Sequence, residues 1–119
     1  MDGLPKNVDL SFLVGREVST VRIGKFQAHY FFNEEAGKPN VWIEIESNDI
    51  TVSGQKISDF KSDADELCAL IGLKIEKAQR RDDGGLILEF AGGPRLEVGI
   101  HSPKFESVVL HIGSDTIVG

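Results

Sequence analysis

The chain has 119 residues, of which 40% are hydrophobic and 27% are charged, a balance typical of one folded domain and not of a disordered segment. Its 13 basic and 19 acidic residues give a formal net charge of −6, which disfavours binding to nucleic acid over a broad face because phosphate backbones are repelled. We expect a single domain over residues 1–119. With one cysteine the chain can form no internal disulfide, and no apolar run is long enough to span a membrane. Because no secretory pattern stands at its start either, we expect the protein in the cytoplasm and without membrane contact.

The first half of the chain begins with a predicted helical turn near residues 9–14 and continues as strands. Apolar and polar residues alternate over 21–23, 26–32 and 41–46, and this period-two pattern is typical of strands with one buried face. Turn residues rich in Gly, Pro, Asn and Asp separate the runs. Short connections of this kind favour antiparallel pairing of neighbouring strands.

A short helix is predicted near residues 62–71. Ser62 or Asp63 can cap it, and acidic residues fill its first turn. The apolar residues that follow are spaced to form a stripe along one face, and Gly72 can end the helix; the stripe consists of Leu67, Leu70 and Ile71.

The second half repeats the pattern of the first, with strands predicted at 86–90, 96–100 and 108–112. Thirteen residues, 9–21, align without gaps to 66–78, and two later matches pair Ala28–Phe32 with Leu86–Phe90 and Ile43–Ile45 with Leu96–Val98. The pattern indicates two similar halves, at about 9–54 and 66–113. We therefore predict an α+β, mainly β fold: an antiparallel sandwich or partly open barrel of about seven to eight strands.

No arrangement of reactive residues predicts catalysis. The three histidines, His29, His101 and His111, lack the spacing that metal sites use, and two of them fall on the polar phase of their strands. Cys68 has acidic or apolar neighbours, whereas a nucleophilic thiol needs a basic setting. We therefore expect simple exposed strand histidines, no metal, no cofactor and no enzymatic activity.

The strongest candidate site lies on the strand at 41–46. If the aliphatic residues of this strand face the core, Trp42, Glu44 and Glu46 project together from the opposite side. Aromatic anchors ringed by charge are typical of recognition surfaces, so these three residues are predicted to bind a partner. The alternative is that a helix or loop covers this side and Trp42 belongs to the core.

The segment LVGREVSTV at 13–21, the aromatic strand through Phe32 and the run VWIEI at 41–45 resemble a family of small bacterial β domains. Some members of this family are similar to the immunity proteins of polymorphic and contact-dependent toxin systems. The resemblance covers most of the chain and implies a stoichiometric inhibitor that binds a toxin domain, with no catalytic residue to carry over. The charge of −6 would steer such a protein toward a basic toxin domain.

Three other functions stay open at this point. A small-ligand-binding domain would use a cleft between the halves, lined by His29, Tyr30 and Phe31. An enzyme with a dispersed site would combine His29 or His111 with a carboxylate. A homodimer would pair an edge strand, 41–46 or 105–112, with its copy.

Overall fold

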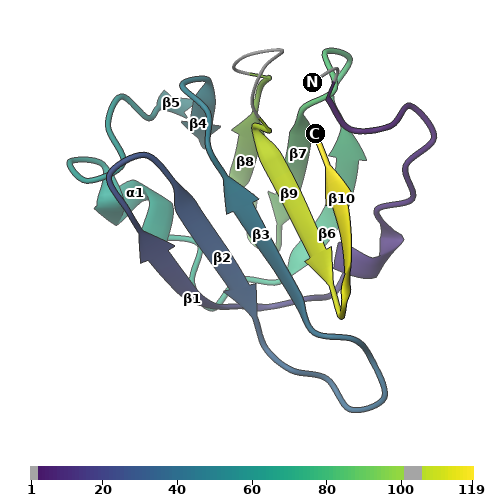
Figure 1. Ribbon diagram of the computed structural model, residues 1–119. Coiled ribbons are helices and arrows are strands. Elements are labelled where there is room, and N and C mark those ends of the chain that lie inside the picture. Colours follow the sequence, from purple (N-terminus) through teal and green to yellow (C-terminus); the bar gives the residue numbers. More distant parts are fainter. Residues whose placement is uncertain (1–2, 101–105) are drawn as a thin grey trace.

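The computed structural model describes residues 3–100 and 106–119 (Figure 1). In these residues, ten strands form two antiparallel sheets of five strands each, accompanied by one helix and one 3-10 turn. The elements, in chain order, are η1 (Ser11–Leu13), β1 (Val18–Ile23), β2 (Ala28–Phe32), β3 (Val41–Ile45), β4 (Ile50–Val52), β5 (Gln55–Lys56), α1 (Ala64–Cys68), β6 (Ile75–Arg80), β7 (Leu86–Phe90), β8 (Arg95–Val98), β9 (Val108–Ile112) and β10 (Asp115–Val118).

The two sheets are the layers of a sandwich. The first sheet has the strand order β1-β2-β3-β9-β10 and lies in front in Figure 1, and the second, behind it, has the order β5-β4-β8-β7-β6. The described strands do not close into a barrel, because β1, β10, β5 and β6 remain edges. The mainly β sandwich is therefore confirmed. The strands outnumber the prediction because β4, β5 and β10 are too short or too polar to show alternation.

The core lies between the sheets and follows from strand alternation. Every second residue of β2 and β3 is buried, namely Ala28, Tyr30, Phe32, Val41, Ile43 and Ile45. They belong to one apolar cluster with buried residues of the second sheet, which include Ile50, Leu88, Phe90, Leu96 and Val98. Each Å² of apolar surface removed from water in this way contributes roughly 25 cal/mol, so the shared cluster is the main force that holds the layers together.

Each half of the chain contributes three strands to one sheet and a hairpin to the other. Strands β1, β2 and β3 belong to the first sheet, whereas the β4–β5 hairpin joins the second sheet through β8. In the same way β6, β7 and β8 belong to the second sheet, and the β9–β10 hairpin joins the first through β3. The two halves have the same strand order and exchange their last hairpins.

The two halves are hydrogen-bonded to each other directly after η1 and after α1. Gly15 N–H donates to Ile75 C=O and Gly72 N–H donates to Val18 C=O, each at 2.8 Å. Both glycines have φ of +86°, a conformation that residues with side chains avoid. The aligned segments 9–21 and 66–78 therefore have the same structural role. In each, the glycine donates a backbone hydrogen bond to the first strand of the opposite half.

Helix α1 lies inside the predicted range 62–71, but two details of that prediction are wrong. Asp63 does not cap the helix with its side chain, because its carboxylate accepts two backbone N–H groups of the preceding loop. Ile71 is 44% exposed and does not join the buried stripe, because α1 ends at Cys68 and the chain turns away. In the described part of the chain, no helix is long and apolar enough to cross a membrane.

The strands proposed as dimer edges are inner strands. β3 pairs with β2 and β9, and β9 pairs with β3 and β10. The segments 41–46 and 105–112, the latter described from residue 106, therefore have no open side for a second copy, and that form of the dimer prediction is wrong.

Candidate functional site

Strand pairing gathers aromatic side chains on the side of the first sheet that faces away from the core. We call this side the outer face. Phe31 stands opposite Trp42 in the β2–β3 pair, and Trp42 stands opposite His111 in the β3–β9 pair. Directly opposed residues have Cβ atoms roughly 4.5–5.5 Å apart, so the three rings form one layer, which we call the aromatic row.

The aromatic row is stacked along its length. The rings of Trp42 and His111 are 3.7 Å apart between centroids and 4° from parallel, and those of Phe31 and Trp42 are 5.3 Å apart and 12° from parallel. The guanidinium of Arg22 lies 5.3 Å from the centroid of Phe31 and covers the far end of the row. Such contacts hold each ring in one orientation.

The burial of β3 decides between the two sequence-based alternatives for Trp42. The aliphatic residues of the strand are buried, whereas Trp42 and Glu44 are half-buried and Glu46 is exposed. Trp42, Glu44 and Glu46 therefore project together from the outer face, as the alternation predicted, and Trp42 lies outside the core.

The structure places two histidines beside Trp42, which the sequence analysis did not expect. His111 Nε2 lies 3.0 Å from Glu44 Oε1, within hydrogen-bonding distance. His29 meets the Trp42 ring edge-on at 5.5 Å, and its Nδ1 is buried with no hydrogen-bond partner in the described residues. The expectation of separate, simply exposed histidines is wrong, because β3 lies between β2 and β9.

An acidic cavity adjoins the aromatic row. Its volume is about 280 Å³, and the residues around it are Gln27, His29, Glu44, Glu46, Glu106 and Val109. Among the described lining residues, three are carboxylates and none is a lysine or arginine, which favours a cation. A guanidinium or ammonium group suits a site of this size. The described residues contain no group of three or more His, Cys, Asp or Glu side chains arranged to hold a metal ion.

The second sheet shows what the same positions look like without such a row. When the two halves are aligned, Arg95 corresponds to Trp42. Glu89, which stands opposite Arg95 in the β7–β8 pair, corresponds to Phe31. Arg95 forms ion pairs with Glu89 at 3.9 Å and with Glu97 at 2.6 Å. Solvent-exposed ion pairs at these positions are therefore compatible with the fold. The stacked rings at the same positions of the first sheet are not required for folding.

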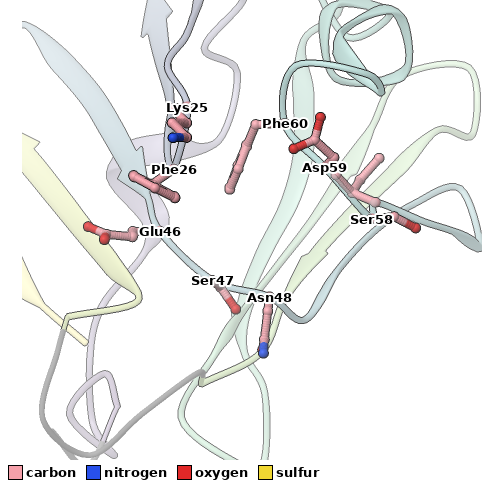
Figure 2. A pocket seen from close by; sticks show the side chains of 9 residues that line it. Lys25, Phe26, Glu46, Ser47, Asn48, Ser58, Asp59 and Phe60 are labelled. Carbon is pink, nitrogen blue, oxygen red and sulfur yellow. The ribbon is translucent and has the colours of Figure 1, made fainter.

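The ligand cleft expected around Tyr30 is absent at that place. Tyr30 is 1% exposed, its hydroxyl donates to Leu67 C=O at 2.8 Å, and burial raises its pKa. Phe31 and His29 belong to the outer face. A cavity of about 400 Å³ opens elsewhere, between the turn after β1 and the segment before α1 (Figure 2).

Of the described residues considered from the sequence, Cys68 does not join the outer face. Cys68 is a free, half-buried thiol in α1. His101 lies outside the described residues.

Comparison with known proteins adds no family to this description. The chain matches no protein-family model, no curated protein and no solved structure. The functional argument therefore depends on the outer face itself.

Proposed function

We propose that this chain is a non-enzymatic binding protein whose outer face binds a basic surface of a protein partner. In its specific form, the proposal is an immunity protein that binds and neutralises a cognate bacterial toxin domain. The resemblance of segments 13–21 and 41–45 to such domains and the net charge of −6 support this specific form.

The aromatic row is the observation that carries the proposal. Half-buried tryptophan at the centre of a sheet face, flanked by charge, is the arrangement found at binding hot spots. Stacking on Phe31 and His111 already fixes Trp42, so little side-chain entropy remains to be lost when a partner covers it.

The charges beside the row favour a basic partner. Glu44, Glu46 and Glu106 surround the cavity of about 280 Å³, which has room for one lysine or arginine side chain. A carboxylate–guanidinium contact at such a place is specific because its geometry is bidentate, and the surrounding field speeds the encounter.

Binding to the product of the neighbouring gene, measured by calorimetry, tests the proposal. The double variant Trp42→Ala, Glu44→Lys removes the anchor and reverses one charge. We expect it to weaken binding at least about 30-fold, the loss typical of one hot-spot residue.

The equivalent positions of the second sheet provide a matched control. The double variant Arg95→Ala, Glu97→Lys makes the same kind of change on the opposite surface and is expected to bind normally. Equal binding by both double variants and the parent chain would show that the outer face is not the binding surface.

A small-ligand-binding function is the second candidate, because His29 lines the acidic cavity. Such a ligand would be a compact cation with a guanidinium or ammonium group. Guanidinium compounds and polyamines would then raise the melting temperature of the parent chain and not that of Glu44→Lys, since a ligand that binds only the native state stabilises it.

A further inference from the structure

The cavity of about 400 Å³ lies at the junction between one turn and one hairpin. The turn follows β1, and the residues that face it flank the β4–β5 hairpin, at 46–48 before it and 57–60 after it. Figure 2 shows Phe26 and Phe60 beside the opening, with charged side chains around them. The apolar lining residues are Phe26, Ile57 and Phe60, and the charged ones are Lys25, Glu46 and Asp59.

The other half of the molecule contains the same junction. Each turn is closed from its first N–H to its last C=O, at 2.8 Å in 24–27 and 2.9 Å in 81–85. Each hairpin is followed by a residue, Ile57 or Gly119, that donates its N–H to the first C=O of that hairpin, at 2.9 and 2.7 Å. The two junctions therefore share these hydrogen bonds, although the 81–85 turn is one residue longer than the 24–27 turn.

In the second junction the gap is filled by the chain itself. Leu4 is 1% exposed and lies between the 81–85 turn and Gly119. Its N–H donates to Gly84 C=O at 2.7 Å, and its C=O accepts from Arg80 Nε at 2.7 Å. The fold thus uses this junction to hold a bent segment that carries one large aliphatic side chain.

Differences between the two turns explain why the first junction stays open. Gly84 lets the N-terminal segment approach closely, since a Cβ on Gly3 would lie only 2.6 Å from Gly84 Cα. Phe26 stands two residues before β2, as Gly84 stands two residues before β7, and Phe26 is 63% exposed. In the described residues, no backbone hydrogen bond joins 57–60 to this turn, so the Phe26 ring forms a wall of an unfilled site.

We infer that this open junction binds a short segment of a protein partner that carries a leucine-sized side chain close to a basic residue. The apolar wall and the volume suit the aliphatic side chain, as Leu4 demonstrates in the equivalent site. Glu46 and Asp59 outnumber Lys25, whose ammonium lies 5.2 Å from the centroid of the Phe26 ring, so a basic neighbour is favoured. The inference depends on the comparison of the halves and does not require the outer-face proposal.

The segment that fills the equivalent site supplies the probe. The peptide Gly-Leu-Pro-Lys-Asn-Val, the sequence of residues 3–8, carries the required leucine and lysine. Titrated at millimolar concentration into the ¹⁵N-labelled protein, it is expected to cause saturable shifts in the amide spectrum at residues 25–26, 46–48 and 57–60. The same peptide with serine in place of leucine is expected to cause none.

Two variants locate the binding. Phe26→Ala removes the wall and is expected to weaken peptide binding at least about fivefold through the loss of apolar contact. Ile71→Ala removes a similarly exposed apolar residue elsewhere and is expected to change nothing, as is Trp42→Ala on the outer face. Well-dispersed spectra of all three variants establish that they fold.

Several results would overturn the inference. These are the lack of saturable shifts, equal binding of the serine peptide, and unchanged affinity in Phe26→Ala. Shifts confined to Leu4, Gly84 and Gly119 would mean that the peptide replaces the chain's own N-terminal segment. Self-association of the parent chain that Phe26→Ala abolishes would identify a second copy as the occupant, contrary to the inference.

Discussion

At the scale of single residues, the outer face depends on side chains that their neighbours hold in place. Trp42 lies between Phe31 and His111, and Glu44 holds His111. Alternation within one strand was sufficient to place Trp42, Glu44 and Glu46 on one side. It was not sufficient to add the histidines, because they come from other strands and a strand's own residues do not specify its neighbours.

Tyr30 allows a pH prediction, since it is the chain's one tyrosine and its absorbance can be followed alone. Burial, followed by the nearby Cys68, raises its pKa above the ordinary 10.0, so the folded state holds this proton more tightly than the unfolded state. The stability that results is complete below pH 10.0 and is lost as the pH rises above it.

We therefore expect tyrosinate absorbance to appear only together with the loss of native circular dichroism in an alkaline titration. A tyrosinate signal with a midpoint near the ordinary value, in a protein whose circular dichroism is still native, would show that the Tyr30 hydroxyl is accessible.

At the scale of elements, the sequence predicted the longer alternating strands and did not predict the strand order. The period-two runs became β2, β3, β7, β8 and β9, and the glycine-ended segments became η1 and α1. The exchange of hairpins was not predictable from alternation, because it depends on which edge each hairpin meets. The short β5, with two polar residues, offered no pattern to detect.

Gly15 and Gly72 yield a prediction at this scale. Gly15→Ala and Gly72→Ala are each expected to lower the free energy of unfolding by about 1–2 kcal/mol, the cost of a left-handed conformation for a residue with a side chain. No atom lies within 4 Å of a Cβ added at either site, so no clash increases the cost. Urea denaturation measures both values.

Nearly equal losses are expected because the two sites are structurally equivalent. Gly85→Ala serves as the contrast and should cost more, since its Cβ would collide with the carbonyl oxygen of Val98. A loss at Gly15 that differs severalfold from the loss at Gly72 would contradict the equivalence of the two halves.

At the scale of the whole molecule, the two sheets share a backbone plan and differ in what their outer sides carry. The first sheet has stacked rings beside an acidic cavity, and the second has a ladder of ion pairs. The difference between the two sheets is what the proposed function uses, because stacked rings of this kind are favoured at interfaces and are not needed for folding.

The most direct measurement uses the fact that Trp42 is the chain's one tryptophan. Protein labelled with 5-fluorotryptophan gives one ¹⁹F resonance, which reports the outer face and nothing else. When the unlabelled product of the neighbouring gene forms a complex with it, we expect the resonance to move and to lose its sensitivity to exchange of H₂O for D₂O, because the partner shields the ring. A complex that forms by size-exclusion chromatography while the resonance and its solvent sensitivity stay unchanged would contradict the account.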